Sequence, residues 1–300
     1  MNVTSFHIEP TNICTLKCAG CARTIFMKQW PQHWKNQSLD VEQLMQFLDI
    51  DLSGMVIELC GNYGDPIYHP RFHELVSSLK ERGALISITT NGSYQKSDWW
   101  EELCGNLTVN DQVRFSIDGI PSNFVQYREN ADWESIQTGI EVCVRHRIKT
   151  VWKFIPFKFN HDYIDQAKQL SQELGMTKFL LDPSDRFDEH TQHLKPSAPL
   201  ISDRNFIKTQ IKTGEHAVVN PACYSGREYF ITATGHFTPC CHIADHRFYY
   251  KTQFGKDHSA YNIRSTTFSK IFANNNVVEF YKNIVSEPPM VCQLNCPSTS

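Results

Sequence analysis

The chain reads Cys14-Thr15-Leu16-Lys17-Cys18-Ala19-Gly20-Cys21 directly after residues 4–9, the first stretch with the composition of a β-strand. These eight residues hold three thiols, separated by three and then by two other residues. The loop that follows the carboxyl end of a strand is where α/β barrels place their chemistry. Three thiolates from one loop can ligate three irons of a four-iron cluster and leave the fourth iron open to a substrate or cosubstrate. The stretch therefore predicts a catalytic iron-sulfur centre.

Composition limits the kind of protein that carries this loop. The 300 residues are 41 % hydrophobic, which is enough for one large core with a small appended unit. The net charge of −3 comes from interspersed charges, so no basic stripe indicates nucleic acid or a membrane surface as a partner. The first residues lack a signal-peptide pattern and no apolar run reaches membrane-spanning length, so we expect a cytoplasmic protein. In that reducing compartment, eleven cysteines indicate metal ligation rather than disulfides.

Strand-like and helix-like segments alternate through the first 183 residues. β-Branched and aromatic residues predict strands at 4–9, 55–60, 85–90, 113–117, 150–157 and 178–181. Apolar residues at helical spacing predict helices at 41–48, 72–82, 97–104, 133–147 and 163–174. Gly83 and Gly175 stand where helix C-caps are expected, and of the two neighbouring tryptophans we expect Trp99 to pack and Trp100 to be partly exposed. Alternation predicts a parallel α/β sheet, either a partial barrel or a doubly wound sheet.

After about Pro183 the alternation stops and turn-forming residues dominate. We expect a barrel domain at 1–183, a linker at 184–219 and a small domain at 220–300. In the last of these, residues 228–232 and 236–240 predict a hairpin around Gly235, followed by helices at 268–272 and 277–284.

The small domain carries a second group of cysteines, Cys223, Cys240, Cys292 and Cys296, whose four thiolates would close a cluster without an open iron. Cys241 adjoins Cys240 and offers an alternative ligand. Because adjacent side chains on a strand point to opposite faces, we expect only one of the two to be a ligand and favour Cys240. The spacing also permits structural zinc, with His242 as a further candidate ligand.

The first loop resembles the cysteine signature of the radical S-adenosylmethionine (SAM) superfamily. The resemblance implies a partial (β/α)6 TIM-like barrel in which Cys14, Cys18 and Cys21 hold a 4Fe-4S cluster. It also implies SAM bound at the open iron, where reductive cleavage yields a 5'-deoxyadenosyl radical. Residues at later strand ends resemble positions around the cosubstrate: Gly64, Asp65, Asn91, Ser116, Asp118 and Lys153.

Two positions depart from the family pattern. Asp65 stands where the family has Glu in a Gly-Gly-Glu-Pro-like segment that receives the methionyl amino group, so a carboxylate is kept with a shorter side chain. Gly20 stands where members often carry an aromatic residue that packs on the adenine, so adenine packing must come from elsewhere in this chain.

The C-terminal cysteines resemble the shortened auxiliary-cluster module called twitch, a reduced relative of the SPASM module. This resemblance implies a small α+β extension in which Cys223, Cys240, Cys292 and Cys296 hold a second 4Fe-4S cluster. Together the two resemblances imply an enzyme that cleaves SAM and abstracts hydrogen from a C–H bond of a small molecule or peptide. Oxidation, dehydrogenation or cross-linking would follow with help from the second cluster, and a flavodoxin or ferredoxin would donate the electron.

The substrate class and two alternative functions remain open at this point. The barrel begins almost at residue one, which leaves no room for a leader-peptide-binding domain and favours a small molecule or short peptide as substrate. An epimerase or rearrangement enzyme would use the second cluster only structurally. A non-enzymatic iron-sulfur or zinc sensor would use the first loop as a zinc knuckle, with His7 or His69 as the fourth ligand.

Overall fold

One sheet organises the residues that this computed structural model describes, which are 3–184, 187, 189, 191–197, 218–296 and 298. Its strands run in the order β6-β5-β4-β3-β2-β1-β7-β8. Their bounds are β1 Ser5–Ile8, β2 Val56–Leu59, β3 Leu85–Thr90, β4 Gln112–Ser116, β5 Lys149–Phe154, β6 Lys178–Leu181, β7 Tyr229–Ile231 and β8 Phe237–Thr238. All neighbours from β6 to β7 are parallel, and β7 and β8 are antiparallel. The predicted α/β fold with a partial barrel is confirmed.

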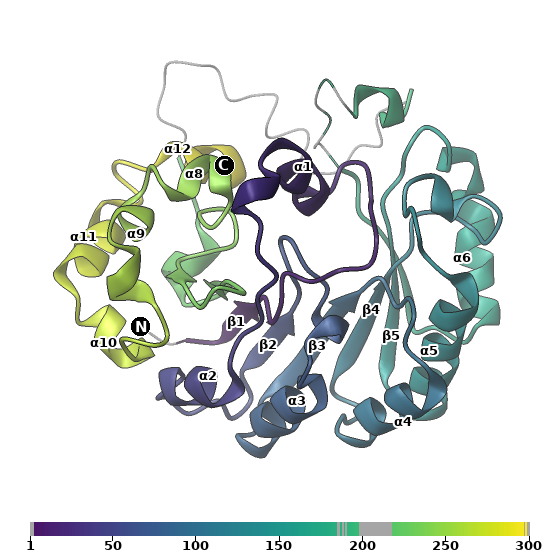
Figure 1. The fold of residues 1–300 in the computed structure, drawn as a ribbon, viewed down its shortest axis with the longest axis horizontal. Helices are drawn as coiled ribbons and strands as arrows, with labels where there is room; N and C mark the ends of the chain where they lie inside the picture. The colour runs from purple at the N-terminus through teal and green to yellow at the C-terminus, as the bar shows by residue number, and fades with distance from the viewer. Residues whose placement is uncertain are drawn as a thin grey trace.

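The helices of the barrel are α1 Ala22–Gln29, α2 Val41–Phe47, α3 Phe72–Glu81, α4 Ser97–Gly105, α5 Trp133–Arg145 and α6 Ile164–Glu173. From α2 to α6 the helices lie along the outer side of the sheet, whereas α1 lies apart from that row (Figure 1). The Asp40 carboxylate accepts from Gln43 N at 2.9 Å and so caps the start of α2. Gly83 and Gly175, with φ of +78° and +73°, end α3 and α6 as predicted. None of the described helices is both long and apolar enough to cross a lipid bilayer.

The two faces of the sheet differ in polarity, as the alternation of side chains along a strand requires. On the outer face Phe6, Ile57 and Phe115 are fully buried beneath the helices. On the inner face, half-buried polar side chains point into the open barrel, and Arg114 there forms an ion pair with Glu58 at 2.9 Å. Polar groups from successive strands can therefore meet inside the barrel, near the carboxyl ends of the strands.

Trp100 corrects one expectation, because it is fully buried instead of partly exposed. Its indole lies 5.5 Å from the ring of Phe115 and against Gly139 of α5. A Cβ at Gly139 would lie 2.5 Å from Cε2 of Trp100, so only a glycine lets α4 and α5 approach this closely. The helical spacing of apolar residues in α4 is compatible with burial of either tryptophan, and it does not determine which of the two faces the core.

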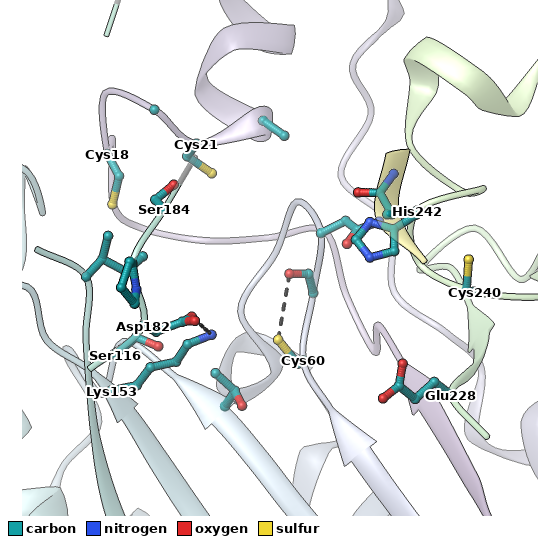
Figure 2. A pocket seen from close by; sticks show the side chains of 18 of the residues that line it. Cys18, Cys21, Cys60, Ser116, Lys153, Asp182, Ser184, Glu228, Cys240 and His242 are labelled. Atoms are coloured by element: carbon teal, nitrogen blue, oxygen red, sulfur yellow. Dashed lines mark hydrogen bonds and ion pairs between the residues drawn. The ribbon is translucent and has the colours of Figure 1, made fainter. Parts of the chain in front are cut away.

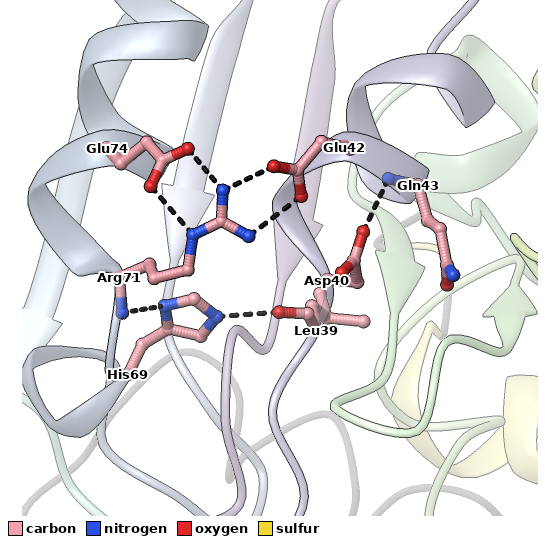
Figure 3. Close-up of polar contacts among 7 residues, drawn as sticks. All are labelled: Leu39, Asp40, Glu42, Gln43, His69, Arg71 and Glu74. Carbon is pink, nitrogen blue, oxygen red and sulfur yellow. Dashed lines mark hydrogen bonds and ion pairs between the residues drawn. The ribbon is translucent and has the colours of Figure 1, made fainter.

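An ion-pair network joins α2 to α3 on the outer side of the barrel (Figure 3). Arg71 pairs with Glu42 of α2 and with Glu74 of α3. Beside it, His69 Nε2 lies 2.8 Å from Leu39 O, and His69 Nδ1 accepts from Arg71 N at 3.1 Å. Because both ring nitrogens of His69 are engaged in hydrogen bonds, this histidine is not the zinc ligand that the sensor alternative needs.

The C-terminal extension packs on the β1 side of the barrel (Figure 1). Besides β7 and β8 it holds short helices: α8 His246–Tyr249, α9 Gln253–Lys256, α10 Phe268–Phe272, α11 Asn275–Asn283 and α12 Met290–Asn295. The helix predicted at 268–272 is present, and that predicted at 277–284 begins two residues earlier. The hairpin is shorter than predicted: β8 ends at Thr238, so Cys240 and Cys241 follow the strand and the argument from alternating faces does not apply to them.

The division into domains at 183 and 220 stays a prediction. Much of the expected linker, namely 185–186, 188, 190 and 198–217, lies outside the described residues. The small predicted domain is not detached from the barrel, because β7 extends the barrel sheet by pairing with β1.

The close approach at Gly139 leads to a stability prediction. Gly139→Ala should destabilise the fold by about 1–3 kcal/mol, since the added methyl overpacks Trp100, despite the better helix propensity of alanine. Urea denaturation of the purified protein measures this. Gly105→Ala is the matched control, because nothing lies within 4 Å of a Cβ there, and it should be neutral or slightly stabilising. Equal effects of the two changes would contradict the packing account.

Candidate active site at the mouth of the barrel

The first cysteine loop lies at the carboxyl end of β1, where the sequence predicts it. Cys14, Cys18 and Cys21 all line one small cavity of about 160 Å³. Cys21 N donates to Cys18 O at 3.1 Å, and Cys21 is the N-cap residue of α1. The positive end of a helix dipole favours a thiolate nearby. The structure thus brings together all three of the predicted ligands of the first cluster.

The donors in this cavity fit an iron-sulfur cluster better than a zinc knuckle. Burial, with smaller contributions from nearby acidic groups, raises the pKa of Cys14 to about 12, and burial likewise raises the pKa of Cys18 to about 12. A bound cation would offset that cost by stabilising the thiolates. His7 does not supply a fourth ligand by its Nε2, which lies 2.9 Å from Cys60 O, and His69 is engaged elsewhere. Within the described residues, no three His, Cys, Asp or Glu side chains converge on a position for a single metal ion.

Gly64 and Asp65 lie where the loop after β2 meets the cysteine loop. A Cβ at Gly64 would overlap Thr11 O, so this close approach requires glycine. The Asp65 carboxylate accepts from Thr90 Oγ1 at 2.7 Å, and from Asn91 N and Asn91 Nδ2 at 2.6 Å each. Burial raises its pKa to about 6, because the hydrogen bonds only partly offset desolvation. Through these hydrogen bonds the Asp65 carboxylate orients Asn91. Asn91 Nδ2 in turn lies 3.6 Å from Cys14 Sγ.

Ser116 and Lys153 are neighbours across β4 and β5 and point into a larger cavity of about 620 Å³ (Figure 2). Lys153 Nζ forms an ion pair with Asp182 at 2.9 Å. Thr89, at the end of β3, lines both cavities, and in the described part of the chain its buried Oγ1 has no hydrogen-bond partner. An unsatisfied buried hydroxyl at a cavity wall is a ready contact for a ligand.

Asp118 is a predicted cosubstrate residue that lines neither cavity. It is fully buried behind Arg128, whose Nη2 and Nε lie 2.7 and 2.8 Å from Asp118 Oδ2. Arg128 itself lines both cavities, and with its charge close to Cys18 it acts to lower the pKa of that thiol. Sequence reasoning missed Arg128, because it stands in an irregular loop where no spacing marks it.

Tyr127 explains the glycine at position 20. The Tyr127 hydroxyl lies 3.2 Å from where a Cβ of Gly20 would be, so a side chain there would be in tight contact with Tyr127. The Tyr127 ring packs on Phe157 with centroids 4.2 Å apart, and both residues line the larger cavity. An aromatic wall therefore stands beside the cysteine loop, although it comes from the segments after β4 and β5.

The second cysteine group lines the larger cavity from the other side. Its four members are Cys223, Cys240, Cys292 and Cys296. Burial raises the pKa of Cys223 and of Cys292 to about 12, and neighbouring thiols add to the effect. Figure 2 shows Cys240 and His242 across the cavity from Cys18 and Cys21. The wall of the larger cavity thus includes Cys18 and Cys21 of the first predicted set and all four members of the second.

Cys240 and Cys241 occupy different surroundings. Burial, and then the thiols of Cys241, Cys223 and Cys292, raise the pKa of Cys240. Cys241 is close enough to Cys60 to contribute to the raised pKa of that thiol, and its carbonyl accepts from Asn62 Nδ2 at 3.0 Å. Cys240 lines the larger cavity with the other three members of its group. Which of the two is a ligand stays a prediction.

A parallel open barrel with three thiols on its first loop, and four more on a C-terminal extension, defines an iron-sulfur enzyme with two centres. Sequence comparison supports this class. The radical SAM superfamily matches residues 8–168, and the SPASM iron-sulfur cluster-binding domain matches residues 223–297. The chain therefore belongs to the radical SAM superfamily, as the cysteine signature predicts.

The match also identifies the cofactors. The radical SAM domain implies a 4Fe-4S cluster with SAM, and the SPASM domain implies auxiliary iron-sulfur binding. These cofactors are the predicted ones, and the protein is an enzyme. The residues that hold each cofactor stay predictions.

One curated relative is the tungsten-containing aldehyde ferredoxin oxidoreductase cofactor-modifying protein of Pyrococcus furiosus. It is 28 % identical over 162 residues, which are 46 % of this chain and 43 % of the relative. The match thus spans less than half of the relative's length.

Solved structures share the fold at low sequence identity. The enzyme anSMEcpe with bound S-adenosylmethionine aligns over 98 % of this chain and 89 % of its own, with a TM-score of 0.61 and 14 % identity. Streptococcus suis SuiB bound to its precursor peptide SuiA aligns over 98 % and 69 %, with a TM-score of 0.64 and 14 % identity. BtrN in complex with S-adenosylmethionine and 2-DOIA aligns over 100 % and 95 %, with a TM-score of 0.51 and 16 % identity. At these identities the likeness establishes the fold alone.

The buried Asp118–Arg128 pair leads to a second stability prediction. Arg128→Met should destabilise the cluster-free protein by about 3–5 kcal/mol, because it leaves the Asp118 carboxylate buried without its cation. Anaerobic urea unfolding measures this loss, and adding Asp118→Asn should recover most of it.

Arg114→Met is the control, because its ion pair with Glu58 is about one-third exposed and should be worth about 1 kcal/mol or less. A loss from Arg128→Met that is no larger than that of the control would contradict the assignment of a buried ion pair.

Proposed function

We propose that this enzyme cleaves SAM reductively and abstracts hydrogen from a C–H bond of a small molecule or peptide. Oxidation, dehydrogenation or cross-linking follows, with the auxiliary cluster as the acceptor of the second electron. The observation that carries this proposal is the cavity of about 620 Å³, which is lined by Cys18 and Cys21 of the first group and by all four members of the second. A substrate in it would contact the barrel mouth and the C-terminal extension together.

In this proposal Cys14, Cys18 and Cys21 hold the first cluster. Cys223, Cys240, Cys292 and Cys296 hold the second. When reduced, the first cluster supplies the electron that splits the sulfonium of SAM and releases the 5'-deoxyadenosyl radical. The choice of Cys240 over Cys241 rests on its place in the cavity wall beside the other three thiols.

The other residues of the mouth bind and orient the cosubstrate. Gly64, Asp65 and Asn91 shape the smaller cavity for the methionyl end. Ser116, Lys153 and the Thr89 hydroxyl face the nucleoside and the substrate. Asp118 acts indirectly, by holding Arg128 against the cysteine loop. Tyr127 and Phe157 supply the apolar surface for the adenine ring that Gly20 does not provide.

The walls of the larger cavity favour a polar substrate. Lys153 pairs with Asp182 there, and Arg227 and Glu228 come from the C-terminal extension. Both signs of charge are present, which suits a peptide or a small molecule with both donors and acceptors. Relatives of this fold include SuiB bound to a peptide and BtrN bound to 2-DOIA. A flavodoxin or ferredoxin donor and a cytoplasmic location complete the proposal.

The enzymatic alternative is epimerisation or rearrangement with a structural second cluster. In an epimerisation a hydrogen atom returns to the substrate carbon after abstraction, whereas in an oxidation none returns. The family match sets the non-enzymatic sensor aside, because the first domain is that of a radical SAM enzyme.

Metal analysis tests the two ligand sets. Cys14→Ala, Cys18→Ala and Cys21→Ala combined should remove about four irons and all formation of 5'-deoxyadenosine, whereas Cys223→Ala with Cys292→Ala should remove the second set and leave the first. Iron, sulfide and zinc are counted after anaerobic reconstitution, and the nucleoside is measured after adding dithionite and SAM. Cys240→Ala should lose the second cluster and its matched control Cys241→Ala should keep it. Full cleavage by the triple variant would overturn the assignment.

Isotope tracing separates oxidation from epimerisation. With deuterated candidate substrates, deuterium should appear in 5'-deoxyadenosine, because the radical removes it from carbon. In D₂O, the product of an oxidation should gain no carbon-bound deuterium, since no hydrogen returns to that carbon. Mass spectrometry of product and nucleoside measures both. A product of unchanged redox level that gains one solvent deuterium would instead establish epimerisation.

A further inference from the structure

Glu9 is a buried carboxylate at the carboxyl end of β1, five residues before the first cysteine of the loop. Only 2 % of the residue is exposed to solvent. It does not line either cavity of the site, and sequence reasoning gave it no role. A carboxylate buried this deeply needs several hydrogen-bond donors around it.

The donors around Glu9 are main-chain N–H groups from two distant segments. Glu9 Oε1 accepts from Tyr63 N at 2.6 Å and from Gly64 N at 3.2 Å. Glu9 Oε2 accepts from Ala233 N at 3.4 Å, in the turn between β7 and β8. The main chain of Glu9 adds a further link, since Glu9 N donates to Ile231 O at 2.9 Å. One side chain thus joins the barrel, the segment after β2 and the C-terminal hairpin.

These hydrogen bonds fix the direction of two carbonyl groups. In a trans peptide the C=O of one residue points opposite to the N–H of the next. Because the N–H groups of Tyr63 and Gly64 point to Glu9, the carbonyls of Asn62 and Tyr63 point away from it. Asn62, Tyr63 and Gly64 line the smaller cavity, whereas Glu9 does not.

The two carbonyl oxygens lack a hydrogen-bond partner within the part of the protein that the structure describes. Among the described residues, no hydrogen bond is recorded to Asn62 O or Tyr63 O. Both residues are half-buried, and main-chain carbonyls away from water are normally paired. Two unpaired acceptors at the wall of a cavity that also holds the cysteine loop suit a ligand amino group, which has only N–H donors to offer.

We propose that Glu9 is a positioning residue that turns the Asn62 and Tyr63 carbonyls toward the amino group of SAM. Through Ala233 it also ties this acceptor pair to the hairpin that leads to the second cysteine group. The inference rests on the proposed function, because it needs SAM in the smaller cavity. A carboxylate that only braced the fold would affect every ligand of the cavity alike.

A binding cycle distinguishes positioning from bracing. The ligands are S-adenosylhomocysteine and its analogue with hydrogen in place of the α-amino group, and dissociation constants are measured by calorimetry on the anaerobically reconstituted enzyme. Glu9→Ala should reduce the preference for the amino ligand by about tenfold, since it loses oriented hydrogen bonds to a polar group. Affinity for the desamino analogue should change little. Glu9→Gln keeps one acceptor oxygen and should lose about threefold, because a neutral amide accepts more weakly than a carboxylate.

Asp111→Asn is the matched control. Asp111 is also a buried carboxylate, and it accepts from Ile86 N at 2.6 Å at the other end of the sheet. Its replacement should leave the ligand preference unchanged. The role of Glu9 is overturned if Glu9→Ala, or Glu9→Gln where the alanine variant does not fold, weakens both ligands by the same factor. Wild-type enzyme that binds neither ligand would instead overturn the proposed function and this role with it.

Discussion

The pairing of β1 with two parallel neighbours is the constraint on which the site depends. β1 lies between β2 and β7, with Ile8 level with Leu59 on one side and with Ile231 on the other. Since parallel strands end at the same edge of a sheet, the segments that follow all three strands meet there. The cysteine loop comes from β1, the Gly61–Asp65 turn from β2 and the hairpin toward Cys240 from β7. A shift of one residue in the β1–β7 register would exchange the two faces of β7 and separate the two cysteine groups.

Because these segments meet inside the protein, several ionisable groups are buried there. The buried carboxylates differ in the groups that pair with them. Asp118 has a cation, Arg128. Asp65 has a hydroxyl and the amide groups of Asn91. Glu9 has main-chain N–H groups alone. The thiols of Cys14 and Cys18 have weaker partners, since Leu16 N and Asn91 Nδ2 lie 3.5 and 3.6 Å from Cys14 Sγ and the charge of Arg128 lies close to Cys18. Burial still raises the pKa of both thiols, so a positively charged centre that stabilises the thiolates would gain by binding there.

The sequence predicted the elements with strong periodicity and the residues with a fixed spacing. All six strands of the barrel, five of its helices and the two cysteine groups followed from pattern alone. Helices such as α8 and α9 span four residues each, which is too short for a helical period to appear. Arg128 and Tyr127 stand in an irregular loop, and only the fold brings them to the cysteines. The sequence does show Glu9 as an acidic residue at the end of a strand. It does not show that the partners of this carboxylate are N–H groups 54 and 224 residues away.

Gly20 shows that a sequence motif and the three-dimensional site can lead to different expectations about which residues line a cavity. Along the chain, glycine at this position means the loss of an aromatic side chain. In space, the Tyr127 ring occupies the neighbouring volume and packs on Phe157, so the aromatic surface persists with a different origin. The two positions are close neighbours, because a Cβ at residue 20 would lie 3.2 Å from the Tyr127 hydroxyl. More than one segment of the chain can therefore supply an aromatic surface beside the cysteine loop.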